Sequence, residues 1–422
     1  MKRLIQLTIS MLICSNAFAQ GYDIYVSDAG NRGAGGGKIL KYDENGDNPE
    51  VFTSENISGP QDIVFLEESN TVLISNLSTN KINRHNATTG AYIDDFATDI
   101  AQPTRTKIGP DGLLYVLQWS GNGKVRRYQL DGTYMGEFTS VGVVQSIGLD
   151  WDSAGNLYVS SYSGGSVRKF DTSGNDMEIF INTNLLGPTD IWFEENGDLL
   201  VSDYNGTAVK RFSSTGAYKS DFLGGLSKSE GYAYLPNGNI LIGNEADKTV
   251  KMFDPSGNYI EDIVSSGSGN LTAPNAIVIR NKSFNLNTGL NDAWFNPETD
   301  GQGFFITIFP DLNVVNLAWF TYDTELPGNG ETANLGDPGH RWLTALGTID
   351  GNKSVMQISI TSGGLFDTAT DVERKTDGTI TLTFKDCDSG TVEYNITSIN
   401  RQGTVPIQRV ANDNSALCKA LQ

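Results

Sequence analysis

The sequence predicts an all-β protein: a six-bladed β-propeller followed by a smaller antiparallel β domain, either a barrel or a sandwich. Three observations predict this fold. One phrase recurs six times, at intervals of 41–44 residues. Each copy contains four short runs of alternating apolar and polar residues, separated by turns rich in Gly, Asn and Asp. After the last copy the repeat stops, and longer strand-like runs follow.

The repeat is clearest at its last strand, which ends in Phe or Ile. Turns such as "PDG", "ENG" and "PNG" separate the strands within each copy. A period near 42 residues with four strands per unit is typical of a propeller blade. A single blade cannot bury both faces of its sheet, so several must pack around one axis. The six terminal residues fall 44, 42, 42, 42 and 41 positions apart, at Phe52, Phe96, Phe138, Phe180, Phe222 and Ile263.

The first copy lacks its inner strand, because it begins at the second strand with "YDIYVSD". The missing strand is present at the other end of the repeat region as "APNAIVIRN", residues 273–281. We expect this last strand to pair with the first and close the ring. The nearly identical heptapeptides "GPQDIVF" (59–65) and "GPTDIWF" (187–193) then mark the start of the inner strand in two blades.

Residues 1–19 are predicted to be a secretory signal peptide. They combine Lys2 and Arg3, a short apolar run and an Ala17-x-Ala19 cleavage site. We therefore expect residues 20–283 to form the propeller, residues 284–422 to form the second domain, and the protein to be exported to the periplasm or out of the cell. No other stretch is long and apolar enough for a transmembrane segment.

The charge and the cysteines limit the partners and the environment. The formal net charge of −20 makes nucleic acid an unfavourable partner and favours divalent cations or neutral sugars. Cys387 and Cys418 are the cysteines that remain after signal removal, and in an exported chain we expect them to form a disulfide. We expect a monomer.

Two sets of mostly oxygen-bearing side chains are expected at the central channel, one residue of each set per blade. Oxygen ligands of this kind suit Ca²⁺, which takes six to eight of them. The first set begins each inner strand and consists of Gln61, Thr104, Gln145, Thr189, Glu230 and Asn275. The second set follows the next strand and consists of Asp28, Asn76, Gln118, Ser161, Asp203 and Asn244.

The stretch "GPTDIWFEENGDLLVSDYNGTAVKRFSSTG" resembles the NHL repeat. Over residues 21–282 the chain is similar to six-bladed propellers of the gluconolactonase and strictosidine synthase type. The enzymes of the gluconolactonase type hold a catalytic divalent metal with a Glu, an Asn and an Asp at the starts of inner strands. Glu230 and Asn275 fall on matching positions, whereas Gln61 and Thr189 occupy the places expected for a further acidic ligand. Asp62 and Asp190 come one residue later, and Asp203 is a further candidate.

The C-terminal region resembles an uncharacterised tail domain of exported proteins from Gram-negative bacteria, over residues 290–421. The resemblance is carried by "NPETDGQGFF", "AWFTYDT" and "GDPGHRWLTA", and it implies no activity. Seven strands are expected, with a short helix at 414–421. The aromatic residues either fill a small β core or stack on a sugar; they are Trp294, Trp319, Phe320, Tyr322 and Trp342.

These features favour a secreted binding or scaffold protein, which would recognise a small molecule, a glycan or a peptide. The residues expected to bind at the channel mouth are Gln61, Asp62, Asp190, Asp203 and Asn244. The alternative is a Ca²⁺-dependent hydrolase or lactonase in which Glu230, Asn275 and Asp203 hold the metal, which would polarise a carbonyl group. The sequence leaves open whether the protein is an enzyme.

Overall fold

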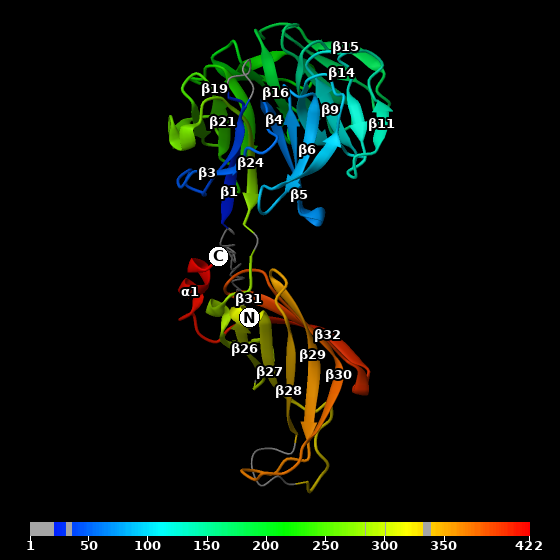
Figure 1. Ribbon diagram of the computed structural model, residues 1–422, viewed down its shortest axis with the longest axis vertical. Coiled ribbons are helices and arrows are strands. Elements are labelled where there is room, and N and C mark those ends of the chain that lie inside the picture. The colour runs from blue at the N-terminus through cyan, green and yellow to red at the C-terminus, as the bar shows by residue number, and fades with distance from the viewer. Residues whose placement is uncertain (1–20, 31–35, 283, 300, 332–338) are drawn as a thin grey trace, which may run out of the picture. The chain divides into compact units, whose positions relative to one another are not determined.

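The structure is a computed structural model that describes residues 21–30, 36–282, 284–299, 301–331 and 339–422. The predicted signal peptide lies outside the described residues. The described chain divides into two compact units, Gly21–Asn281 and Lys282–Gln422 (Figure 1). Of the helices in the described part of the chain, none has the length and apolar character needed to cross a membrane.

The first unit consists of six four-stranded antiparallel sheets, which are the blades of a propeller. Blades are numbered from the first strand of the chain. Blades 1 and 2 are formed by β24 (Pro274–Asn281), β1 (Tyr22–Asp28), β2 (Lys38–Tyr42) and β3 (Glu50–Thr53), and by β4 (Pro60–Leu66), β5 (Thr71–Asn76), β6 (Lys81–Asn86) and β7 (Tyr92–Ala97). Blades 3 and 4 are formed by β8 (Pro103–Ile108), β9 (Leu114–Gln118), β10 (Arg126–Tyr128) and β11 (Tyr134–Glu137), and by β12 (Ser146–Trp151), β13 (Leu157–Ser161), β14 (Ser166–Phe170) and β15 (Asp176–Ile181). Blades 5 and 6 are formed by β16 (Pro188–Phe193), β17 (Leu199–Asp203), β18 (Ala208–Phe212) and β19 (Tyr218–Gly224), and by β20 (Ser229–Tyr234), β21 (Ile240–Asn244), β22 (Thr249–Phe253) and β23 (Tyr259–Val264).

The ring closes as the sequence predicts. Strand β24, from the end of the repeat region, pairs antiparallel with β1, and Ile24 lies opposite Ile279. The first blade therefore takes its inner strand from the far end of the propeller segment. This pairing ties the two ends of the segment together and leaves no blade incomplete (Figure 1).

The blades pack on one another through aromatic residues that the repeat places at fixed positions. Tyr158, on the second strand of blade 4, has its ring centroid 4.9 Å from that of Phe180 in its own blade. The same ring lies 4.8 Å from Phe193 on the inner strand of blade 5. Because a second strand is covered on both faces, all five residues of β13 are buried, whereas outer strand β15 is mostly exposed.

All six inner strands contain a β-bulge near their start. In β4, for example, the register with β5 shifts between Pro60 and Asp62. A bulge bends the strand and redirects its side chains. At the bulge of β20, Gly231 has φ +55°, and a Cβ atom there would lie 1.7 Å from the carbonyl oxygen of Asn275. Glycine is therefore required where this inner strand approaches blade 1.

The second unit is a closed eight-stranded antiparallel barrel, which decides between the two predicted alternatives. The sequence predicts seven of its strands and misses the short β25, which closes the barrel by pairing with β32. The short helix expected at the end of the chain is α1 (Ser415–Ala420). The strands run in chain order as β25 (Asp292–Phe295), β26 (Gly303–Phe309), β27 (Val314–Tyr322), β28 (His340–Thr348), β29 (Lys353–Ser362), β30 (Glu373–Phe384), β31 (Ser389–Ile396) and β32 (Arg401–Arg409).

The predicted disulfide joins Cys387, in the turn between β30 and β31, to Cys418 in α1. Both cysteines are buried beside the barrel core. The disulfide therefore holds the C-terminal helix against the barrel.

Replacing both cysteines by Ser is expected to destabilise the barrel by about 3–4 kcal/mol, because the unfolded chain regains the entropy of an open loop. The bond closes a sequence separation of 31 residues. Urea unfolding of the double variant, followed by tryptophan fluorescence, measures the loss. An unchanged unfolding midpoint would contradict a stabilising role.

Candidate functional site

The inner strands place one residue per blade at the same level of the channel. Each comes directly before the inner-strand residue that pairs with the Val or Ile two positions before the end of the second strand. Three of these residues are charged and three are small. The pairing assigns this level to Asp62, Arg105, Gly148, Asp190, Gly231 and Ala276. At Gly148 and Gly231 the backbone of the next blade lies where a side chain would be.

Arg105 lies at the centre of this level and is 4% exposed. Its Nε donates to Oδ2 of Asp190 at 3.1 Å. Its Nη1 donates to the carbonyl oxygen of Gln61 and to Oδ1 of Asn275, and its Nη2 lies 4.0 Å from Oε2 of Glu230. One guanidinium thus links blade 3 with blades 1, 2, 5 and 6.

The charge of Arg105 is maintained by its neighbours. Burial opposes the charged form, but Asp190, Asp62 and Glu230 together outweigh burial, so that the pKa of Arg105 lies above its usual value. The buried carboxylates in turn have a fixed counter-charge within the channel.

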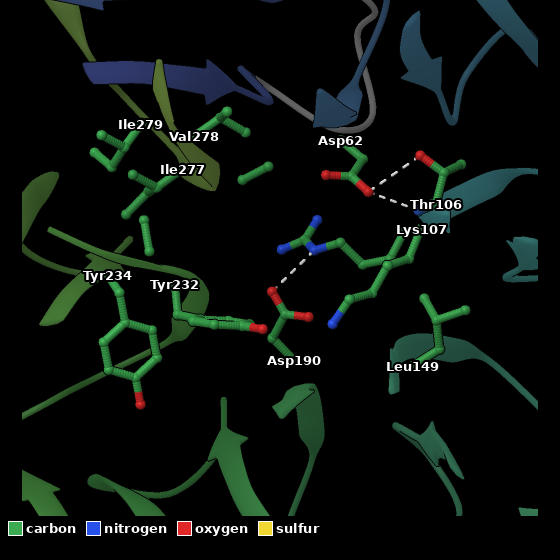
Figure 2. Close-up of a pocket in the computed structure, with 13 residues that line it drawn as sticks. Asp62, Thr106, Lys107, Leu149, Asp190, Tyr232, Tyr234, Ile277, Val278 and Ile279 are labelled. Carbon is green, nitrogen blue, oxygen red and sulfur yellow. Dashed lines mark hydrogen bonds and ion pairs between the residues drawn. The ribbon is translucent and has the colours of Figure 1, made fainter. Parts of the chain in front are cut away.

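Asp62 is held in place from blade 3. Its Oδ2 accepts hydrogen bonds from the backbone N–H of Thr106 at 2.6 Å and from the Thr106 hydroxyl at 3.2 Å (Figure 2). Burial raises the pKa of Asp62 to about 6, although Arg105 and the Thr106 N–H act in the opposite direction. Asp62 therefore changes charge within the pH range from mildly acidic to neutral.

A cavity of about 320 Å³ lies next to this charged level, along the later part of the inner strands. Asp62, Arg105 and Asp190 line it together with Lys107, whose Nζ is 2.8 Å from Oδ1 of Asp150. The walls are formed by aromatic side chains from blade 6 and by apolar side chains of β24, as Figure 2 shows; these are Tyr232, Tyr234, Ile277, Val278 and Ile279.

The aromatic wall is rigidly packed. The ring of Tyr232 stacks on Trp192 with centroids 4.0 Å apart and planes 14° apart. Nε1 of Trp192 donates to the hydroxyl of Tyr234 at 3.0 Å. Tyr234 is 44% exposed, so part of its ring remains available to a ligand.

Most of the predicted first set lies one step before the charged level and is buried. Gln61 and Asn275 are hydrogen-bonded to each other at 3.1 Å, and Glu230 is near Arg105. Thr104 and Thr189 donate to backbone carbonyls of the neighbouring blade or strand. These residues join adjacent inner strands around the axis.

The position expected of Gln145 is wrong. Inner strand β12 begins at Ser146, and Ile147 occupies the place equivalent to Gln61. Gln145 precedes the strand with φ +49°, like Gln102 before β8 with φ +57°. Gln145 therefore lies two residues before the place expected of it, an offset that the sequence alone does not show.

The second predicted set has a structural role that repeats in every blade. Each side chain bonds to the backbone of the segment that leads into the inner strand of its own blade. Oδ1 of Asp203 accepts from the N–H groups of Leu186 and Gly187 at 2.9 and 2.7 Å, and Oδ1 of Asn244 accepts from Ser227 N–H at 2.7 Å. The equivalent bonds are made by Asp28, Asn76, Gln118 and Ser161.

The structure therefore brings together only some of the predicted binding residues. Asp62 and Asp190 line the cavity, and Gln61 contacts Arg105 through its backbone. Asp203 and Asn244 are fully buried and do not line this cavity. Asp203 also pairs with Lys210, with Oδ2 to Nζ at 2.8 Å.

Arg105 is the main residue that sequence reasoning missed. The sequence does contain a sign of it: in "PTRTKI" an Arg stands where "PQDIVF" and "PTDIWF" have Asp.

The arrangement does not fit the Ca²⁺ site that the resemblance implies. The side-chain oxygen of Asn275 accepts from Arg105, and the Arg105 cation lies beside Glu230, where it would repel a second cation. Asp203 is occupied with backbone N–H groups and Lys210. Among the described residues, no group of three or more His, Cys, Asp or Glu side chains is arranged to hold a metal ion.

No family model and no curated protein matches this chain. Solved structures with a similar fold include a nidogen/laminin complex, with a TM-score of 0.51 and 15% identity over 62% of this chain and 98% of that chain. A virginiamycin B lyase from Staphylococcus aureus has a TM-score of 0.42 and 15% identity over 58% of this chain and 84% of the lyase. A putative gluconolactonase has a TM-score of 0.40 and 12% identity over 57% of this chain and 91% of that chain.

At these identities the likeness concerns the fold alone. It agrees with the six-bladed propeller of the NHL type that the sequence predicts. It indicates no activity for this chain.

Arg105→Gln is expected to destabilise the protein by about 3–5 kcal/mol, because it leaves Asp190 and Glu230 buried without their counter-charge. Urea unfolding measures the change. Arg168→Gln is the matched control, since Arg168 pairs with Asp176 in a partly exposed position and its loss should change stability by about 1 kcal/mol or less. Equal losses in the two variants would contradict the role assigned to Arg105.

Asp62→Asn is expected to remove a pH dependence of stability. In the folded protein Asp62 keeps its proton up to a pKa of about 6, whereas the unfolded chain releases it near 3.8. The stability that protonated Asp62 contributes is therefore full below pH 3.8 and is lost as the pH rises through 6. The difference in unfolding free energy between the parent and Asp62→Asn should fall by about 3 kcal/mol over this range. Parallel pH profiles from urea titrations would contradict the raised pKa.

Proposed function

We propose that the protein is a binding protein whose propeller holds a small polar ligand, or the end of a glycan or peptide, in the channel cavity. The observation that carries this proposal is that hydrogen bonds and ion pairs hold Arg105 in a fixed position at the edge of a cavity of about 320 Å³. A site of this kind presents charge and hydrogen-bonding groups in fixed positions, which lowers the entropy lost on binding.

The chemistry of the lining supports a neutral or zwitterionic ligand. Asp62, Asp190 and the nearby Asp150 are balanced in part by Arg105 and Lys107. A chain with a net charge of −20 repels polyanions. The exposed part of Tyr234 and the apolar side chains of β24 suit the apolar face of a sugar ring or an amino-acid side chain.

The same geometry gives little support to the alternative of a calcium-dependent lactonase. That mechanism needs a metal ion with free oxygen ligands, and in this channel a guanidinium occupies the region between Glu230 and Asn275. The calcium-dependent activity stays an untested prediction.

Glycan and peptide arrays probed with the full chain test the proposal. Tyr234→Ala should weaken binding by about tenfold, because it removes an aromatic surface from the cavity wall. Tyr218→Ala is the matched control, since Tyr218 is similarly exposed, at 42% against 44%, but lies on outer strand β19. Equal binding by both variants, or silent arrays together with turnover of a lactone in calcium, would overturn the proposal.

A further inference from the structure

The C-terminal barrel contains its own cavity, of about 730 Å³, at one end of its interior. Along β27 the inward-facing residues Val315 and Leu317 are fully buried, Trp319 is 8% exposed, and Thr321 is more exposed still. Along β29 the same change occurs between the buried Ile358 and the partly exposed Ile360. The barrel is therefore packed with side chains at one end and open at the other. An eight-stranded barrel is wide enough to hold one small ligand in such a space.

The cavity has an aromatic and aliphatic floor. The ring of Trp319 lies 5.1 Å from Phe304 and 5.2 Å from Tyr394. Around them, Leu343, Ile360 and Val405 line the cavity and are only partly buried, although they pack against the core. Apolar surface left accessible inside a concave site gains free energy when an apolar group covers it.

The described charged residues on the rim of the same cavity carry a net positive charge. Among the described residues that line it, Arg341 and Arg401 are basic and Asp323 is the acidic residue. Arg341 pairs with Asp323, with Nη2 to Oδ2 at 2.6 Å, so the positive charge of Arg401 is left in excess. His340 lies on the rim as well, beside Tyr322 with ring centroids 5.6 Å apart. This local excess of basic residues favours an anionic group at this place.

We propose that the barrel binds a small apolar molecule with a carboxylate head, with its aliphatic or aromatic body on the Trp319 floor and its carboxylate at the rim near Arg401. Floor and rim select different parts of one ligand. The apolar floor disfavours a fully hydroxylated sugar, and the basic rim disfavours a cationic amphiphile. This binding does not depend on the function proposed for the propeller.

The first experiment measures binding of 1-anilinonaphthalene-8-sulfonate to the full chain by fluorescence, followed by displacement with dodecanoate. Dodecanoate should displace the dye at concentrations about tenfold lower than dodecanol or dodecyltrimethylammonium, because only the carboxylate pairs with the rim. Failure of dodecanoate to displace the dye, or equal displacement by all three compounds, would overturn the proposal.

Variants then locate the site. Ile360→Trp fills the cavity and should weaken dodecanoate binding by about tenfold or more. Val355→Trp is the matched control, because Val355 lies on the same strand but is 58% exposed on the outer face, and it should bind like the parent. Unchanged affinity in Ile360→Trp would place the ligand elsewhere and overturn the proposal.

Arg401→Gln tests the rim without altering the packed core, since the Arg401 side chain is exposed. It should weaken dodecanoate binding by about tenfold and leave dodecanol binding unchanged. Equal losses for the acid and the alcohol would show that Arg401 does not contact the carboxylate. This variant decides the question even if Ile360→Trp fails to fold.

Discussion

The guanidinium of Arg105 connects its own blade to four others across the axis of the propeller. Neighbouring blades are otherwise joined mainly by apolar packing and by short hydrogen bonds between adjacent inner strands, such as Thr104 to Ser146. The contacts of Arg105 bring non-adjacent blades together at the channel, where six inner strands converge. A long, planar, permanently charged donor suits this place because it reaches several acceptors at once. Its presence also decides the chemistry of the channel, since the carboxylates near it are already paired.

The repeated and the unrepeated polar residues of the propeller have different roles. The side chain at the end of each second strand recurs as Asp, Asn, Gln or Ser, and in each blade it bonds to the backbone that leads into the inner strand. A role present in all blades is a requirement of the fold. Arg105, Asp62 and Asp190 occupy a level at which the other blades have glycine or alanine. Residues that break the repeat are therefore the better candidates for a specific function.

The barrel shows a similar division along its length. One end is filled by residues such as Ile306, Leu317 and Met356, which are essentially inaccessible and account for the stability of the unit. At the other end the strands continue beyond the packed core, and their inward-facing positions change to a mixture of aromatic, polar and basic residues. If these inward-facing positions contributed to stability alone, we would expect apolar residues that complete the packing at this end of the barrel. The change in character along the same strands is what distinguishes a ligand cavity from an unfinished core.

The sequence by itself determined the fold to a large extent. Period, turns and alternation can be read directly from the sequence, so they predicted the six blades, the pairing of the 273–281 segment with the first strand and most barrel strands. The disulfide was predicted from the two cysteines that remain in a chain expected to be exported. Only the tertiary structure decided the candidate sites. The pairing of each inner strand fixes which of its residues lie at the charged level. It places Asp62 and Asp190 there, whereas Gln145 lies before the start of its strand. Arg105 acquires its partners from blades far apart in the chain, up to the 170 residues that separate it from Asn275. Such contacts follow from closure of the ring, and no local pattern encodes them.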